Sequence, residues 1–169
     1  MTHARRGRPS TAPSVEILIE SPLWKAVPAA KTTVRRAVVA AAPPTADNAA
    51  IAILLTDDQS IRTLNRQWRG LDKATNVLSF PAPSAGQGAG TPMMLGDIVI
   101  AYETTAKEAA EEGKPFLDHL SHLAVHGLLH LVGYDHESHE DAEKMESLEQ
   151  RILARLGVPD PYSVPDAKA

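Results

Sequence analysis

Three histidines in the C-terminal half of the chain have the residue type and the spacing of a metal site. His126 and His130 are four residues apart, so on a helix their imidazoles share one face. Gly133 can adopt the left-handed conformation that ends a helix, and the turn after it can bring His136 back toward the other two. Three imidazoles with a fourth coordination position left free are typical of a catalytic zinc site. We therefore predict that His126, His130 and His136 bind one zinc ion per chain; a surface helix that is merely rich in histidine is the alternative.

The residue after the first histidine separates two kinds of zinc enzyme. The spacing His-x-x-x-His-x-x-Gly-x-x-His also occurs in metzincin peptidases, which place a glutamate general base directly after the first histidine. Here that position holds Gly127. Glycine inside a helix costs about 1 kcal/mol relative to alanine, so we expect that space is needed beside the metal. Without the glutamate, a metal-dependent peptidase or other hydrolase is only the alternative hypothesis.

Other polar residues near the triad have less specific patterns. The mostly apolar helix that carries the triad also carries His122 and His119 on the same stripe. We expect His122 to line a cleft or support the ligands, and His119 to be partly exposed. Asp135, directly before His136, could orient a ligand imidazole or accept a proton, or could simply form the turn. The acidic run 137–149 is expected to be a solvated helix face.

A second group of candidate residues lies on an earlier helix. Arg62, Arg66 and Arg69 follow at i, i+4 and i+7 and form a basic stripe. The planar guanidinium group matches phosphate oxygens. We expect Arg69, at the helix end, to neutralise phosphate charge near the metal, and expect Arg62 and Arg66 to pair with local acids. Further cations that could extend this surface are Lys31, Arg35 and Arg36.

The composition sets limits on the setting of the protein. The chain has 169 residues, of which 43% are hydrophobic and none is cysteine, so any metal must be held by nitrogen and oxygen. No apolar run is long enough for a membrane span and no secretory signal is seen, which favours the cytoplasm and no membrane partner. A net charge of −4 argues against a general nucleic-acid-coating protein, so contact with nucleic acid would use a local basic surface.

The pattern of elements predicts an α/β fold: one small domain, a sandwich with a mixed sheet of about four strands and about five helices. We expect a disordered basic arm over 1–13, a catalytic metal-binding domain over 14–158 and a tail over 159–169. The segment from Pro81 to Pro92 is expected to be a flexible loop. The expected strands are Val15–Glu20, Ala50–Leu55, Asn76–Phe80 and Leu95–Ala101. The expected helices are Lys31–Ala42, a helix capped by Thr56 or Asp57 and ended by Gly70, Tyr102–Glu112, Pro115–Val132 and Ser138–Leu156.

Together these motifs resemble the YbeY family of bacterial endoribonucleases, which act in rRNA maturation and ribosome quality control. The resemblance runs through the segments His122–His136, Leu64–Pro81 and Leu95–Ile100, and covers about Val15 to Gly157. It implies a small α/β fold and a zinc-dependent, single-strand-specific endoribonuclease. It also implies metal binding by the three histidines named above and a functional arginine at Arg69. Ala74 stands where many relatives have proline, away from the metal ligands.

The resemblance also implies the partners. Single-stranded RNA, rRNA precursors and the ribosome or its small subunit are the expected ones. The sequence leaves open whether a water or the ribose 2′-hydroxyl is the nucleophile. A non-catalytic ribosome-assembly factor with a structural metal is a further alternative. Three imidazoles suit zinc, but nickel, copper and iron stay open.

Overall fold

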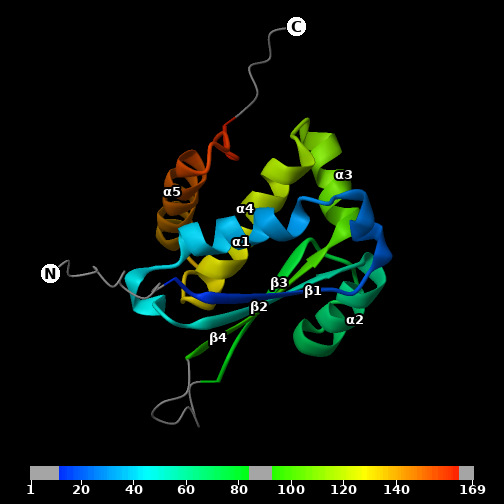
Figure 1. Ribbon diagram of the computed structural model, residues 1–169, viewed down its shortest axis with the longest axis horizontal. Coiled ribbons are helices and arrows are strands. Elements are labelled where there is room, and N and C mark those ends of the chain that lie inside the picture. The colour runs from blue at the N-terminus through cyan, green and yellow to red at the C-terminus, as the bar shows by residue number, and fades with distance from the viewer. Residues whose placement is uncertain (1–11, 84–92, 164–169) are drawn as a thin grey trace, which may run out of the picture.

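Four strands and five α-helices follow one another in the computed structural model, which describes residues 12–83 and 93–163 (Figure 1). The α/β prediction, with a four-stranded mixed sheet and five helices, is confirmed. The strands are β1 (Ser14–Ile19), β2 (Ala50–Thr56), β3 (Val77–Pro81) and β4 (Met94–Ala101). The helices are α1 (Ala30–Ala41), α2 (Asp58–Arg69), α3 (Tyr102–Glu112), α4 (Phe116–Leu131) and α5 (His139–Arg155), with short 3-10 turns at Pro22–Ala26 and Pro44–Ala46.

The sheet has the order β1-β2-β4-β3. Strands β1, β2 and β4 are parallel, and β3 runs antiparallel to β4 at the edge. The central strand β2 is an almost continuous apolar run, as expected for a parallel strand covered on both faces. Gly96 in β4 has a φ of 137°, and a Cβ atom there would lie 2.2 Å from the Phe80 carbonyl oxygen. Only glycine therefore allows β3 and β4 to approach this closely.

Helices cover the two faces of the sheet unequally. Helices α1 and α4 lie over one face and α2 lies against the other (Figure 1). Alternate residues of β4 enter two separate cores: Ile98 and Ile100 join the large one, and Val99 and Ala101 join the small one under α2. Because α4 packs between the sheet and its neighbours α1, α3 and α5, it forms the centre of the large core.

The helix ends agree with the capping signals. Asp57, rather than Thr56, caps α2 by accepting a hydrogen bond from the Ser60 amide at 2.9 Å. Gly70 ends the helix in the left-handed conformation with a φ of 71°. Ser138 caps α5 through the Asp141 amide. The caps fix where each helix starts and stops, and so where its functional residues emerge.

Parts of three predicted segments lie outside the described residues. These are the arm, at residues 1–11, and the loop after β3, at residues 84–92. The last part of the predicted tail, residues 164–169, is also outside them. Among the residues that the structure does describe, no helix is long and apolar enough to cross a membrane.

Candidate metal centre

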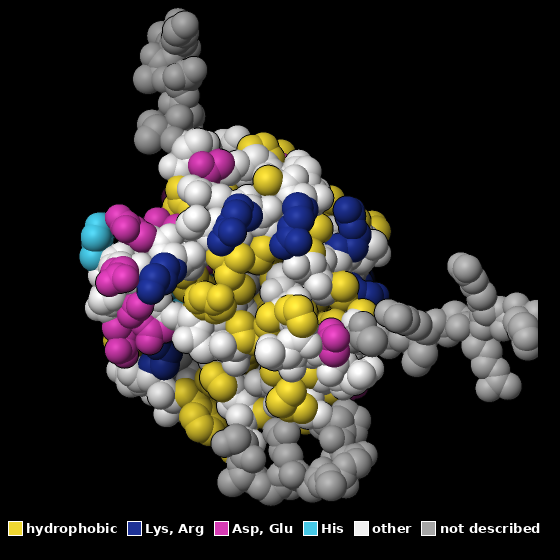
Figure 2. Space-filling view, turned by 90° about the vertical axis from the view of Figure 1, so that its left-hand side faces the viewer, with side chains coloured by type: hydrophobic (Ala, Val, Ile, Leu, Met, Phe, Trp, Pro, Cys, Tyr) yellow, Lys and Arg dark blue, Asp and Glu magenta, His cyan; other side chains and the backbone are white. Residues whose placement is uncertain are grey.

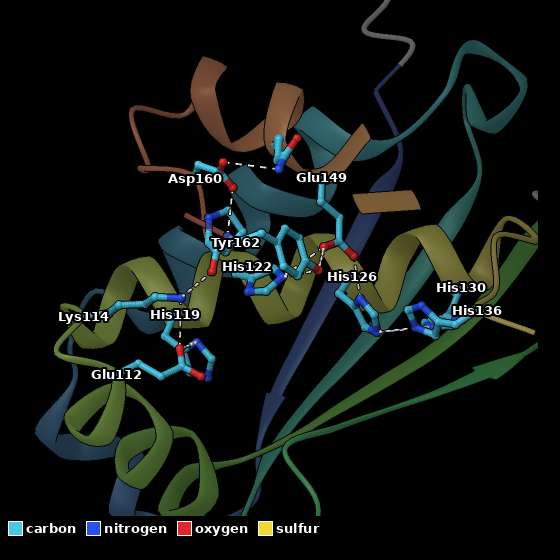
Figure 3. Close-up of polar contacts among 12 residues, drawn as sticks. Glu112, Lys114, His119, His122, His126, His130, His136, Glu149, Asp160 and Tyr162 are labelled. Carbon is cyan, nitrogen blue, oxygen red and sulfur yellow. Dashed lines mark hydrogen bonds and ion pairs between the residues drawn. The ribbon is translucent and has the colours of Figure 1, made fainter. Parts of the chain in front are cut away.

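Helix α4 positions two of the three predicted ligands. Most of its residues are buried. Of its histidines, His122 and His126 face α5, and His130 lies at the helix end (Figure 3). At that end the Gly133 amide donates to the His130 carbonyl at 3.2 Å, and Gly133 has a φ of 103°. This left-handed residue turns the chain back, so that His136 comes to lie beside His130.

The three imidazoles converge on one point (Figure 3). The Nε2 atom of His130 lies 3.0 Å from the Nε2 atoms of both His126 and His136, and the last two are 3.3 Å apart. A tetrahedral zinc ion with Zn–N bonds of about 2.0–2.1 Å separates its ligand nitrogens by about 3.3–3.4 Å. The separations in this protein are therefore close to those of a zinc site.

The protonation chemistry of these rings also fits a metal. His126 donates its Nδ1–H to Glu149, which leaves a lone pair on Nε2. Burial, with smaller contributions from the nearby His126 and His136 rings, lowers the pKa of His130 to about 4, although a hydrogen bond with the Tyr134 backbone and the charge of Glu149 act in the opposite direction. His130 is therefore neutral at pH 7. Three nitrogen atoms that all carry lone pairs cannot donate hydrogen bonds to one another, but all three can bind the same cation.

Glu149 of α5 supports the first ligand from behind. Its side chain is fully buried, and one carboxylate oxygen accepts the His126 Nδ1–H at 2.5 Å. The other oxygen lies 3.1 Å from His122 Nε2 and also accepts the Tyr162 hydroxyl (Figure 3). Burial raises the pKa of Glu149, but the hydrogen bonds from His122, His126 and Tyr162 outweigh it and bring the pKa to about 2. Glu149 is therefore ionised, as an acceptor that fixes a metal-ligating histidine should be.

The sequence interpretation missed Glu149. Within the acidic run 137–149, Glu137, Glu140 and Glu143 are exposed as predicted, but for Glu149 the solvated-face prediction is wrong. A signal was present, because Glu149 lies four residues after Met145 and three before Ile152, on the apolar stripe of α5. A charged residue on such a stripe must have a buried partner.

His122 and His119 continue the histidine row along α4. His122 contacts Glu149 and the Tyr162 hydroxyl, at 3.1 and 3.3 Å, and so shares the Glu149 carboxylate with His126. The predicted partial exposure of His119 is wrong, since its side chain is only 4% exposed. Its Nε2 atom lies 3.2 Å from a carboxylate oxygen of Glu108 in α3. The packing of α3 against α4, which no local pattern reveals, buries this ring.

Gly127 provides space for the sheet, not for the metal. A Cβ atom at this position would lie 2.9 Å from Ile98 Cγ2, 3.3 Å from Ser79 Oγ and 3.4 Å from Val77 Cγ2. The Ser79 hydroxyl also donates to the Gly127 carbonyl at 2.8 Å. The expectation of room beside the metal is therefore wrong. Because position 127 faces β3 and β4, a glutamate there would enter the core.

Replacing Gly127 by alanine is expected to lower the free energy of unfolding by about 1 kcal/mol. Alanine gains about 1 kcal/mol in helix propensity, but overpacking a tight core costs about 1–3 kcal/mol. Denaturant unfolding measures the difference. The control Ala110→Gly, at an exposed site of α3, reports the propensity contribution alone. A Gly127→Ala protein more stable than the wild type would show that the neighbouring side chains of β3 and β4 can shift to accept the added methyl group at little cost.

The structure places the two predicted catalytic residues differently. Asp135 is exposed next to His136, and its Oδ1 atom accepts the Glu137 amide at 2.6 Å, as in a turn-forming aspartate. Arg69 is exposed on the last turn of α2, on the sheet face opposite α4 (Figure 1). In residues 12–83 and 93–163, Arg69 makes no ion pair, and no contact joins it to the three histidines.

The remaining cations form separate surfaces. Arg62 pairs with Asp72 at 2.9 Å, as expected for a solvated helix face. The cations of α1 lie on the other side of the sheet from α2, so the expectation that they extend the Arg69 surface is wrong. Figure 2 shows that basic side chains cross one face in a row while acidic ones gather at its edge. The net charge of −4 thus coexists with local basic surfaces, which are what nucleic-acid contact requires.

Comparison with known proteins found a family model and relatives that match most of the chain. Residues 24–157 match the family model of endoribonuclease YbeY. A protein named endoribonuclease YbeY from Rhodopseudomonas palustris (strain BisA53) is 61% identical over 160 residues, which cover 91% of this chain and 92% of the relative. A namesake from Bradyrhizobium diazoefficiens is 56% identical and covers 89% of this chain and 86% of the relative. The solution structure of a Thermotoga maritima protein superposes with a TM-score of 0.51 and is 26% identical in sequence. The match covers 92% of this chain and 99% of the Thermotoga chain.

Proposed function

The chain belongs to the YbeY endoribonuclease family, and from this premise we propose that it is a zinc-dependent endoribonuclease that cleaves single-stranded RNA. Family membership supports the endoribonuclease activity. The observation that supports the zinc is the convergence of three Nε2 atoms at 3.0–3.3 Å. The buried Glu149 behind His126 adds to this support, because metal-ligating histidines usually donate the N–H of their other ring nitrogen to a carboxylate or carbonyl.

Each residue of the site has a distinct role in this proposal. His126, His130 and His136 hold the metal, which when bound supplies Lewis acidity toward the phosphodiester and lowers the pKa of water. Glu149 holds His126 in the tautomer whose Nε2 atom faces the metal. Asp135, one residue before the last ligand, is the candidate proton acceptor. Arg69 binds a phosphate of the RNA strand.

The wider role rests on the family. We propose that rRNA precursors and defective rRNA are the substrates, and that the ribosome or its small subunit is the partner, in the cytoplasm. The absence of cysteine suits a reducing compartment. A peptidase of metzincin-like spacing is disfavoured, because position 127 faces the sheet and holds glycine. A ribosome-assembly factor with a purely structural metal is the other alternative. Such a protein would bind the metal but cleave no RNA, so the cleavage assay below tests it.

The test is to remove and restore the metal. The purified protein is assayed for bound zinc and then incubated with single-stranded RNA, duplex RNA and an unfolded protein, before and after chelation. We expect zinc at one per chain, cleavage of the single strand only, loss of cleavage on chelation and recovery with zinc. A 2′,3′-cyclic phosphate product with a 5′ hydroxyl would identify the ribose hydroxyl as nucleophile, and a 5′ phosphate with a 3′ hydroxyl would identify water. Zinc-dependent proteolysis without RNA cleavage would favour the peptidase.

Replacing Arg69 by alanine is expected to weaken RNA cleavage about 10- to 100-fold and leave bound zinc unchanged. A charge-assisted hydrogen bond to phosphate contributes about 1.5–3 kcal/mol, and Arg69 is remote from the ligands. The salt dependence of RNA binding should also fall, with a slope smaller by about 0.7 for one phosphate contact on a single strand. The control Arg151→Ala, at an exposed site of α5, should change neither the rate of RNA cleavage nor the salt dependence of RNA binding. Unchanged cleavage and salt slope in Arg69→Ala would remove Arg69 from the site.

A further inference from the structure

The exposed tryptophan of α2 stands out on the surface of this protein. Trp68 is 70% exposed, whereas the second tryptophan of the chain, Trp24, is only 1% exposed. Trp24 also donates its indole N–H to the Thr56 carbonyl at 2.8 Å and packs in the large core. A large aromatic ring left in water loses the free energy that burial would give. An exposed tryptophan is therefore a candidate contact for a partner.

Trp68 is held in place by a second ring. Its indole packs edge-on against Phe80, with ring centroids 5.9 Å apart and an interplanar angle of 61°. Phe80 itself is half-buried and packs against the small core under α2. The indole thus rests on one aromatic neighbour and leaves most of its surface open.

Two exposed cations follow Trp68 closely in the chain. Arg69 follows Trp68 directly, and Lys73 lies in the loop that Asn65 holds against α2 through a 2.9 Å hydrogen bond to the Lys73 carbonyl. Both cations are exposed, and neither forms an ion pair within the part of the chain that the structure describes. Arg62, by contrast, is occupied by Asp72. Free cations beside an exposed aromatic ring match the two parts of a nucleotide, its phosphate and its base.

Strand β3 connects the aromatic pair to the helix that carries two of the predicted metal ligands. Strand β3 is the edge strand of the sheet. Its Ser79 side chain points toward α4 and donates to the carbonyl of Gly127, the residue after His126. Phe80, the next residue, points to the opposite face. The aromatic pair and the Gly127 turn of α4 therefore lie on opposite faces of the same short stretch of the edge strand.

We propose that Trp68 and Phe80 form a stacking platform for an unpaired nucleobase of single-stranded RNA, with Arg69 and Lys73 binding the adjacent phosphates. The strand would pass around the β3 edge between this platform and the metal centre. Bases in a duplex are paired and stacked on each other, so only a single strand can offer a base to the indole. The RNA substrate class rests on the proposed function; the position of the platform comes from the structure.

Fluorescence provides a direct test, because Trp68 is exposed and Trp24 is buried. The zinc-loaded protein is titrated with a short 2′-O-methyl oligoadenylate, whose integrity is checked on a gel. A matched oligomer of abasic units carries the same phosphates and no bases. Base stacking should quench the Trp68 emission with the adenylate but not with the abasic oligomer. Trp68→Phe should lose the quenching and keep its affinity within about threefold, since phenylalanine still stacks.

Affinity measurements on Trp68→Ala complete the test. We expect this variant to bind the oligoadenylate about 5- to 150-fold more weakly than the wild type, and to bind the abasic oligomer unchanged. Leu71→Ala, at a nearby exposed apolar residue, is the control and should bind like the wild type. Equal affinity of Trp68→Ala and wild type for the adenylate would overturn the platform, as would equal loss with both oligomers or no binding by the wild type.

The two proposals can fail separately. RNA cleavage that depends on zinc but is unaffected by Trp68→Ala would leave the nuclease standing without its platform. Base-dependent quenching of Trp68 in a protein that cleaves no RNA would support the platform and contradict the nuclease.

Discussion

Replacing His130 by alanine is expected to abolish zinc binding and, with it, RNA cleavage. His130 Nε2 is the atom that lies 3.0 Å from both other ligand nitrogens, so its removal takes out the centre of the site. Two imidazoles alone leave zinc without the three protein ligands that catalytic sites use. Metal analysis of the purified variant, together with cleavage of single-stranded RNA, measures both effects.

Two further histidine variants make this result specific. His136→Ala removes a ligand from an exposed position after α4 and should lose zinc with little effect on the core. His139→Ala removes a ring that is 91% exposed and pairs with Glu143 at 3.1 Å, and should keep both zinc and activity. Full zinc content in His130→Ala would contradict the triad. RNA cleavage that persists in both zinc-free variants would point to a contaminating nuclease.

The convergence of the three histidines could be predicted because its geometry is local. His126 and His130 are one helical turn apart, and Gly133 turns the chain within the next three residues, so the backbone alone brings the rings together. The same holds for the caps of α2, where Asp57 and Gly70 lie at the helix ends that they specify. Most strand boundaries also fall within one residue of the prediction, because the alternating and continuous apolar runs match the faces that α1, α2 and α4 cover.

The parts that could not be predicted depend on contacts between distant segments. Glu149 reaches His126 because α5 packs on α4 across 23 residues of chain, and His119 is buried because α3 closes over it. The role of Gly127 depends on how closely β3 and β4 approach α4. The sequence shows such residues only as departures from a helix pattern: a glycine within a helix, or a charged residue on its apolar stripe. In this protein the helix glycine, Gly127, lies at a close contact with the sheet, and the charged residue, Glu149, belongs to a buried polar network.

Replacing Glu149 by glutamine is expected to weaken zinc binding about 10- to 100-fold, the usual cost of losing a partner that orients a metal ligand. Glutamine keeps the shape of the side chain but loses its charge, and only one of its two terminal atoms can accept a hydrogen bond. It therefore cannot accept from both His122 and His126, which lie 3.1 and 2.5 Å from the two carboxylate oxygens. The His126 ring is then free to change its tautomer. Competition with a chelator of known affinity measures the loss.

Glu149→Ala should add a loss of stability to the loss of zinc affinity. Removing one partner of a buried ionic network costs about 3–5 kcal/mol, and the Glu149 side chain is fully buried. Denaturant unfolding of the zinc-free proteins separates this cost from metal binding. Glu143→Gln is the matched control for Glu149→Gln. It makes the same substitution on the same helix, at an exposed carboxylate that also pairs with a histidine. It should leave zinc affinity and stability as they are. Glu149→Gln with wild-type zinc affinity would show that the His126 orientation is set by the packing of α4 alone, and that the buried carboxylate serves the fold and not the metal.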